Sequence, residues 1–216
     1  MLSIYQQNKK FFLGFFAIIL SALFISLSYT KPEGFYLLNF YHTGFLTYFF
    51  IYATYLGDGI FCIVIGLLLL LFRKRLVGLM VLASYALSGI IAQVLKYYIV
   101  EPRPAILLKD SAYPYFIDDV TLHNLHAFPS GHTASAFALA ATLSFYVGNK
   151  NYSLLFLCGA IIVGYSRIYL AQHFLDDVFA GAILGVISSI ACKLLLENTF
   201  LKMKFVNGYL PANQKT

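Results

Sequence analysis

Long apolar runs alternate with shorter polar connections along most of the 216-residue chain. Six runs come close to the length of a bilayer span, and they cover approximately residues 11–29, 55–72, 76–95, 131–147, 154–170 and 177–196. Because a transmembrane helix needs about 20 mostly apolar residues, the pattern predicts an all-α fold, a bundle of six transmembrane helices. We expect a single domain over residues 1–216.

Two stretches between the runs predict other structures. Residues 35–54 are rich in Tyr and Phe, which favour the membrane–water interface. We therefore expect an interfacial helix there, between the first and second membrane helices. The connection 97–130, between the third and fourth membrane helices, contains four of the six prolines. Connections of this length inside compact domains are often functional, and we expect a substrate-facing lid on the outer side.

Composition strengthens the membrane assignment. Hydrophobic residues make up 60% of the chain and charged residues 11%, against about 25% charged in soluble domains. The three cysteines, Cys62, Cys158 and Cys192, fall inside apolar runs and form neither a disulfide framework nor a zinc spacing. The first run lacks an Ala-x-Ala cleavage site and is longer than most signal cores. We expect it to be retained as a helix.

The formal charge of +6 is not gathered in one polar segment that could bind nucleic acid. The basic residues are sorted between alternate connections instead. The larger set, which the positive-inside rule assigns to the cytoplasm, is Lys9, Lys10, Arg73, Lys74, Arg75, Lys150, Lys193, Lys202, Lys204 and Lys215. Both termini are then cytoplasmic. The outer connections hold the remaining cations, all five histidines and every acidic residue except Glu197.

Two clusters on the outer side contain candidate chemistry. In "KYYIVEPRP", Lys96 closes the third helix and Arg103 lies between two prolines; taken alone, both could be cations that extend to the interface. In "FPSGHTASA", Ser130 is a preferred N-cap residue and Gly131 opens the fourth helix. The amides of a helix N-terminus form an anion site. His132 lies in the first turn of that helix.

The stretch "SRIYLAQHFLDD" forms a third cluster. If a helix begins near His173, Asp177 shares its face four residues later, and the carboxylate can hold one ring nitrogen while the other faces a substrate. Asp176 is a possible substitute. Arg167 ends the preceding helix and returns to the same place across a short turn.

Ionisable groups at membrane depth cost a few kcal/mol each, so several that converge from separate helices need a common partner. Two Arg, one Lys and a helix N-terminus make a cationic site, and phosphate suits the forked donors of Arg and the point charge of Lys. Two histidines remain for proton transfer and bond breaking.

With these residues, the chain resembles the type 2 phosphatidic acid phosphatase (lipid phosphate phosphatase) superfamily. The pattern of that family is Lys, six residues, Arg-Pro; Pro-Ser-Gly-His; and Ser-Arg, five residues, His, three residues, Asp. The matching residues are Lys96, Arg103 and Pro104; Pro129, Ser130, Gly131 and His132; and Ser166, Arg167, His173 and Asp177. Every position matches in order, over residues 96–177.

The resemblance implies a role for each residue. His173 would be the nucleophile that forms a phosphohistidine, with Asp177 fixing its tautomer. His132 would protonate the leaving oxygen and then activate water. The groups that would hold the phosphate oxygens are Lys96, Arg103, Ser130, Gly131 and Arg167.

No metal and no cofactor are expected. His123 and His126 are close in sequence, but no further Cys or carboxylate cluster completes a metal site. The substrates that the family suggests are undecaprenyl pyrophosphate, phosphatidylglycerol phosphate, phosphatidic acid and lipid A phosphates. The small size is typical of a bacterial protein of the cytoplasmic (inner) membrane, with the active site facing outwards. The sequence does not specify an oligomeric state.

Two alternatives remain open. The same site could transfer the phosphoryl group to a lipid acceptor, which would make the protein a phosphotransferase. A transporter or lipid-binding protein is the alternative outside enzymes, but the charges cluster at one face and transporter sites usually lie at mid-bilayer. Asp58, between two glycines, is expected to end a helix, and Gly181 and Gly185 to allow close helix packing against "TASAFALAA".

Overall fold

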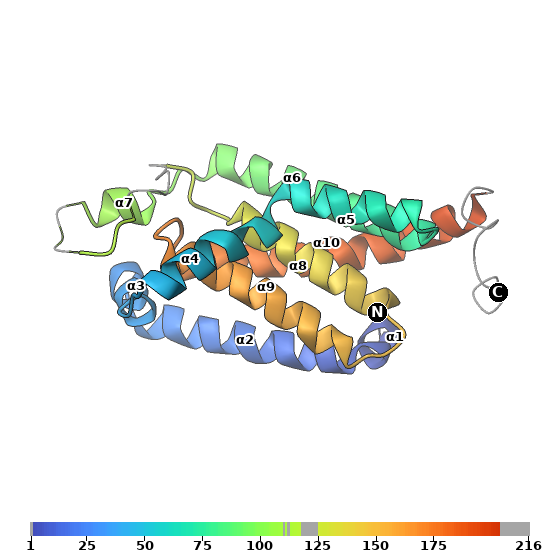
Figure 1. The fold of residues 1–216 in the computed structure, drawn as a ribbon, viewed down its shortest axis with the longest axis horizontal. Coiled ribbons are helices and arrows are strands. Elements are labelled where there is room, and N and C mark those ends of the chain that lie inside the picture. Colours follow the sequence, from blue (N-terminus) through green and yellow to red (C-terminus); the bar gives the residue numbers. More distant parts are fainter. Residues whose placement is uncertain (1, 110, 112, 118–124, 204–216) are drawn as a thin grey trace.

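In the computed structural model, which describes residues 2–109, 111, 113–117 and 125–203, the chain is an elongated helical bundle (Figure 1). The described residues contain no strand, so the predicted all-α class is confirmed. The elements are α1 Leu2–Gln7, α2 Lys9–Ser28, α3 Lys31–Leu38, α4 Gly44–Ala53, η1 Thr54–Gly57, α5 Gly59–Leu71, α6 Arg75–Tyr98, α7 Pro104–Leu107, α8 Gly131–Tyr146, α9 Tyr152–Tyr169 and α10 Leu175–Lys202. Helices α3 and α7 lie at one end of the bundle, and α1 lies at the other with the end of α10.

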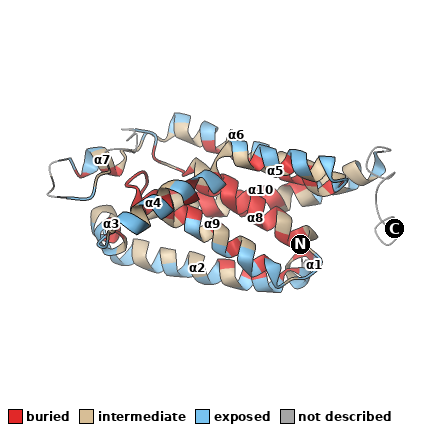
Figure 2. Cartoon of the chain, in the orientation of Figure 1, coloured by how far each residue is buried: buried red, intermediate tan, exposed pale blue. Residues whose placement is uncertain are grey.

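Helix α8 is the centre of the bundle. It packs against α6, α9 and α10, and every side chain from Thr133 to Thr142 is buried (Figure 2). A Cβ atom on Gly185 would lie 2.4 Å from the carbonyl oxygen of Ala134, and one on Gly181 would lie 2.5 Å from that of Ser130. The predicted close approach of these two helices is therefore confirmed, and it depends on glycine at both positions.

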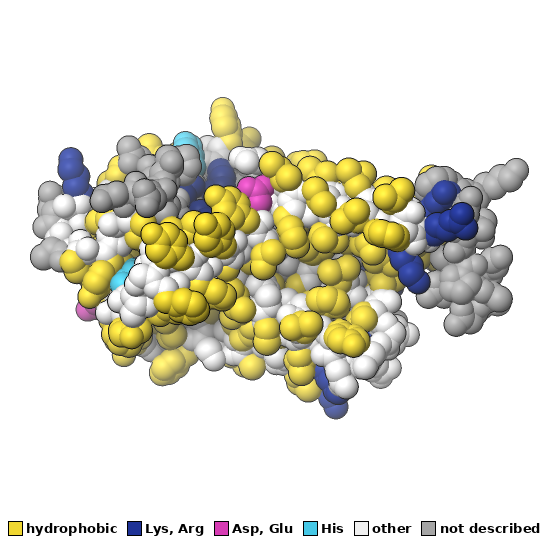
Figure 3. Space-filling view, viewed as in Figure 1, with side chains coloured by type: hydrophobic (Ala, Val, Ile, Leu, Met, Phe, Trp, Pro, Cys, Tyr) yellow, Lys and Arg dark blue, Asp and Glu magenta, His cyan; other side chains and the backbone are white. Residues whose placement is uncertain are grey.

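Four helices are long and apolar enough to cross a membrane: α2, α6, α9 and α10. The pair α4–η1 and α5, bent by 55° at its break, makes a possible fifth span. Apolar side chains cover much of the outer surface of these helices, as Figure 3 shows for one face. Helix α8 has 16 residues, which is short for a full crossing, so the count of six spans stays a prediction.

The expected single helix over 35–54 is wrong, because the chain forms two helices, α3 and α4, with a break between them. The break has a physical cause at each side. The buried amide of Asn39 donates to the carbonyl of Ile168 at 3.0 Å and to the hydroxyl of Tyr113 at 2.7 Å. The hydroxyl of Thr43 accepts from the backbone N–H of Leu46 at 3.2 Å and so caps the new helix. An interfacial position for either helix stays a prediction.

Asp58 lies at the bend between η1 and α5. Its carboxylate accepts from the backbone N–H of Ile60 at 2.9 Å, which places it at the N-cap of α5. The predicted helix-end role of Asp58 is confirmed.

The long connection between α6 and α8 is anchored where it leaves α6. The backbone N–H of Ala127 donates to the carbonyl of Glu101 at 3.1 Å, and the Glu101 carboxylate forms an ion pair with Lys31 of α3. Residues 110, 112 and 118–124, which include His123 and much of the expected lid, lie outside the described residues.

Candidate active site

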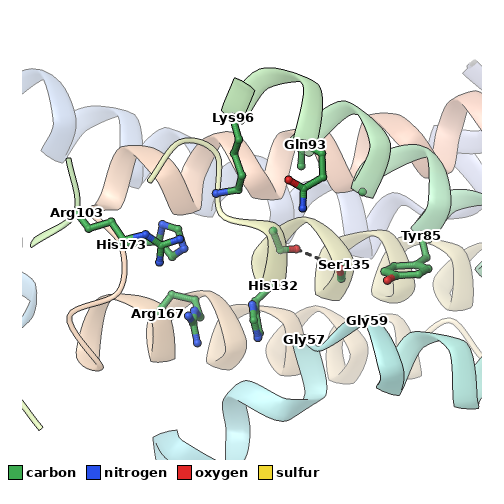
Figure 4. A pocket seen from close by; sticks show the side chains of 13 residues that line it. Gly57, Gly59, Tyr85, Gln93, Lys96, Arg103, His132, Ser135, Arg167 and His173 are labelled. Atoms are coloured by element: carbon green, nitrogen blue, oxygen red, sulfur yellow. Dashed lines mark hydrogen bonds between the residues drawn. The ribbon is translucent and has the colours of Figure 1, made fainter. Parts of the chain in front are cut away.

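A cavity of about 270 Å³ lies where α6 ends and α8 begins. Figure 4 shows its two sides. The charged half, as we call it, is lined by Lys96, Arg103, Gly131, His132, Arg167 and His173. The neutral half is lined by Gly57, Gly59, Tyr85, Gly89, Ala92, Gln93 and Ser135. Six of the eight predicted site residues therefore line one cavity, although they come from four separate parts of the chain.

The start of α8 is joined to the start of α10 through the backbone. The N–H of Ser130 donates to the carbonyl oxygen of Asp177 at 2.9 Å. Ser130 is the N-cap of α8 by position, as predicted, but its hydroxyl accepts from Thr133 at 2.9 Å and makes no hydrogen bond to a backbone N–H. Ser130 is fully buried behind the cavity wall, and its backbone N–H is already used. Gly131 and His132 line the cavity and Ser130 does not, so a contact of Ser130 with phosphate stays a prediction.

His173 lies in the turn before α10 and is 2% exposed. Its Nδ1 is 3.3 Å from the Asp177 carboxylate, which also accepts from the backbone N–H of Phe174 at 2.9 Å. The predicted pairing of His173 with Asp177 is confirmed. With Nδ1 engaged, Nε2 is the ring nitrogen left for the cavity. The carboxylate of Asp176 accepts from the hydroxyl of Ser26 instead, so it does not substitute for Asp177.

Burial lowers the pKa of the His173 imidazole well below its usual 6.5, and the positive charge of Arg167 lowers it further. A low pKa keeps the ring neutral at physiological pH. The environment therefore favours the form of histidine that has a free lone pair.

Arg167 is the most deeply placed cation of the charged half. It lies in the last turn of α9 and is 8% exposed. Its Nη1 donates to the hydroxyl of Thr54 at 2.6 Å. Its Nε is buried without a hydrogen-bond partner among the described residues. One edge of the guanidinium is thus ready to bind an acceptor.

Arg103 and Lys96 approach from the other side and are held by main-chain oxygens. Arg103 donates through Nη1 to the carbonyl of Gln172 at 3.3 Å and through Nε to that of Leu125 at 3.2 Å. Burial lowers the pKa of Arg103 below its usual range. Lys96 donates to the carbonyl of His126 at 2.6 Å. These bonds fix both cations at the rim of the cavity.

The charges in this cavity all have the same sign. Among the residues that line it, none is Asp or Glu, and three are Lys or Arg. Partly buried cations are weakly screened, so the cavity attracts an anion strongly. An anion with several oxygens would pair with all three cations at once.

A metal centre has no support in the described part of the chain, where no group of three or more His, Cys, Asp or Glu lies close enough to hold an ion. The Nδ1 of His126 lies 2.7 Å from the carbonyl oxygen of Lys96. His126 is thus a loop residue that helps to hold Lys96 in place.

The sequence analysis missed the neutral half. Its residues are uncharged and lie inside apolar runs, where Gly, Ser and Tyr are read as packing residues. The signal that could have pointed to it is "LGDG" at 56–59, in which a polar residue between two glycines interrupts an apolar run. That interruption is the bend whose Gly57 and Gly59 form part of the cavity wall.

Comparison with known proteins identifies relatives of this arrangement. The sequence profile of the PAP2 superfamily matches residues 77–200. Phosphatidylglycerophosphatase B of Bacillus subtilis is 28% identical over 149 residues, which cover 62% of this chain and 67% of that protein. Undecaprenyl-diphosphatase of Sulfolobus acidocaldarius is 27% identical over 154 residues, which cover 71% and 72%. The crystal structure of Aquifex aeolicus LpxE matches with a TM-score of 0.64 and 33% identity, over 76% of this chain and 94% of that one.

Proposed function

Since this chain belongs to the PAP2 superfamily, we propose that it is an integral membrane enzyme that hydrolyses a lipid phosphate at the outer face of the cytoplasmic membrane. The observation that carries the proposal is the charged half of the cavity. Three cations and two histidines from separate elements line one space that contains no acidic side chain. The names of the relatives, which are lipid phosphatases, support the same reaction class.

In the proposed first step, Nε2 of His173 attacks the phosphorus atom. A nitrogen–phosphorus bond forms as the bond to the lipid oxygen breaks, and the leaving oxygen takes a proton from His132. Asp177 holds the proton on Nδ1 and stabilises the positive ring. The hydrogen-bond distance between His173 and Asp177 supports this assignment.

In the second step a water molecule attacks the phosphohistidine. His132, now neutral, takes the proton of that water, and the nitrogen–phosphorus bond breaks to release inorganic phosphate. Acid–base assistance of this kind contributes roughly 10²- to 10⁴-fold. The position of His132 on the cavity wall, between His173 and the neutral half, supports its place on the leaving-group side (Figure 4).

The equatorial oxygens of the phosphoryl group are held by Lys96, Arg103, Arg167 and the Gly131 amide at the start of α8. Charge moves through these oxygens during transfer, and fixed donors stabilise it best where water is excluded. The proposed mechanism needs no metal, and the assay in chelator below tests this.

The substrate is a phospholipid phosphate, a polyprenyl pyrophosphate or a lipid A phosphate, the classes that the relatives' names contain. A lipid tail needs access from the bilayer, and the neutral half offers an uncharged surface beside His132 for the leaving group. The cations at the opposite end of the bundle, Arg73 to Arg75 among them, support a cytoplasmic position for that end.

The test is phosphate release by the detergent-solubilised protein from phosphatidylglycerol phosphate, phosphatidic acid, undecaprenyl pyrophosphate and lipid A phosphates, with a metal chelator present. We expect turnover of at least one substrate, and the rank order names the substrate class. Loss of all turnover in chelator would contradict the metal-free mechanism. Donor labelled in its phosphate separates hydrolysis from transfer, because transfer leaves the label in the lipid phase.

A further inference from the structure

The bent span α4–η1–α5 passes directly beside the charged half of the cavity. At the start of η1, four residues before the break, Thr54 is 9% exposed and its hydroxyl accepts from Nη1 of Arg167 at 2.6 Å. Thr54 lies outside residues 77–200, the part that matches the family profile. This contact therefore joins a candidate phosphate-binding group to an element that the sequence motifs do not include.

The geometry of the guanidinium gives this contact a consequence. In the planar guanidinium, the Nε–H bond and one N–H bond of Nη2 point in the same direction, away from Nη1. Nε and Nη2 therefore form an edge that can donate two parallel hydrogen bonds to phosphate oxygens. Thr54 occupies Nη1 and leaves this edge open. The Nε of Arg167 is buried and has no partner among the described residues, as expected for an edge that awaits a ligand.

The turn that carries Thr54 is itself firmly placed. A Cβ atom on Gly57 would lie 2.7 Å from the carbonyl oxygen of His132 and 2.4 Å from a methyl carbon of Val163. The η1 backbone is therefore packed tightly against the start of α8 and against the C-terminal half of α9. A hydroxyl on such a turn has little freedom to follow a moving arginine.

We propose that Thr54 is a positioning residue that orients Arg167, so that its Nε–Nη2 edge meets the phosphoryl group. An arginine side chain loses substantial rotamer freedom when it is fixed. A partner that fixes it before substrate binds removes that cost from the reaction. The inference rests on the proposed phosphatase function.

The test compares Thr54→Val, which keeps the shape and removes the hydroxyl, with Thr54→Ser, which keeps the hydroxyl. A hydrogen bond to a charged group is worth about tenfold or more. We expect Thr54→Val to lower kcat/KM by about that factor, mainly through kcat, and to weaken inhibition by orthovanadate in parallel. Thr54→Ser should stay close to wild type. If Thr54→Val does not fold, Thr54→Ala makes the same comparison.

Thr47→Val is the matched control. Thr47 lies on the same helical wall, and its hydroxyl is 3.2 Å from the hydroxyl of Tyr169, two residues beyond Arg167. Its hydroxyl faces Tyr169 and not the guanidinium of Arg167, which donates to Thr54. The kcat of Thr47→Val and its inhibition by vanadate should therefore stay unchanged.

A double-mutant cycle separates positioning from a general packing effect. In an Arg167→Lys background, which keeps a charge but loses the fork, Thr54→Val should cause little further loss. Equal losses in both backgrounds, or full activity of Thr54→Val and Thr54→Ala, would overturn the inference while leaving the proposed function intact. A wild-type protein that released no phosphate from any lipid phosphate would overturn the proposed function itself.

Discussion

The two halves of the cavity differ in their residue types and in the parts of the helices that carry them. The charged half stands on helix ends and turns, and its side chains are held by main-chain oxygens or by one another: Lys96 by His126, Arg103 by Gln172 and His173 by Asp177. The neutral half lies on the end of η1 and on the interiors or first turns of α5, α6 and α8, and it consists largely of small residues. Under the proposed function, the charged half would act on the phosphoryl group and the neutral half would accommodate the leaving group.

The largest expected effect comes from removing the nucleophile in the charged half. In His173→Ala the phosphohistidine cannot form, so we expect phosphate release to fall at least about a thousandfold. The measurement is release of phosphate from the best lipid substrate by purified variant. The binding of orthovanadate reports on the cations separately. Substantial remaining turnover would mean that the nucleophile lies elsewhere.

Next in size is the loss of the carboxylate behind the nucleophile. Asp177→Asn removes the charge that holds the His173 tautomer, and we expect kcat to fall roughly a hundredfold or more. Asp176→Asn is the matched control, because Asp176 is the adjacent acid and bonds to Ser26 instead. Similar losses in the two variants would point to a general fault in the start of α10.

A shift in pH dependence tests the electrostatics of the charged half. Burial and Arg167 both lower the pKa of His173, and protonation on the acid side removes the nucleophile. The acid limb of kcat/KM should therefore lie below pH 6.5, the usual value for histidine. The charges of Arg103, Lys96 and His132 lower the pKa of His173 as well, but Arg167 is the largest charge effect after burial. Arg167→Gln removes that effect, so the limb should move to higher pH.

Lys74→Gln provides the reference for that pH shift. Lys74 is an exposed cation in the turn between α5 and α6, at the opposite end of the bundle. The acid limb of kcat/KM of the Lys74→Gln variant should coincide with that of the wild type. An unmoved limb in Arg167→Gln would show that the charge of Arg167 does not reach His173.

The smallest expected effect lies in the neutral half. A Cβ atom on Gly59 would lie 2.1 Å from the hydroxyl oxygen of Tyr85, so Gly59→Ala must displace that ring. We expect kcat/KM for a lipid substrate to fall about tenfold, a loss typical of a methyl-sized misfit in a pocket, with the acid limb unchanged. Gly89→Ala adds the same methyl group to the same cavity with no atom within 4 Å, and less than about a twofold change is expected. If the two variants behaved alike, the leaving group would not pass this wall.

The charged half could be predicted from sequence because ionisable groups are rare in so apolar a chain, and each one needs a reason to be there. The pairing of His173 with Asp177 follows from their spacing of four residues. The neutral half could not be predicted, since a glycine that lines a cavity and one that packs a helix look the same in sequence. Gly181 and Gly59 illustrate the two cases.

Two details of the fold differ from the sequence-based expectation: the break in the helix over 35–54 and the hydrogen bond of the Ser130 hydroxyl. The residue pattern over 35–54 does not show that the side chain of Asn39 points into the bundle. The carbonyl groups that accept from its amide lie about 130 residues later, on α9. Ser130 occupies a position that favours a cap, but a neighbouring hydroxyl occupies its side chain. Contacts between distant parts of the chain decide the break at Asn39, whereas at Ser130 two adjacent hydroxyls can pair in more than one way and the residue pattern does not select between them.

The backbone bond from Ser130 to the carbonyl of Asp177 has a consequence for how this protein tolerates change. A bond between main-chain atoms survives replacement of either side chain, so the register between α8 and α10 is indifferent to most substitutions. An inserted or deleted residue between positions 174 and 181 would instead rotate one helix start by about 100° and separate the two imidazoles. Variation in chain length near this junction should therefore be far more damaging than variation in residue type.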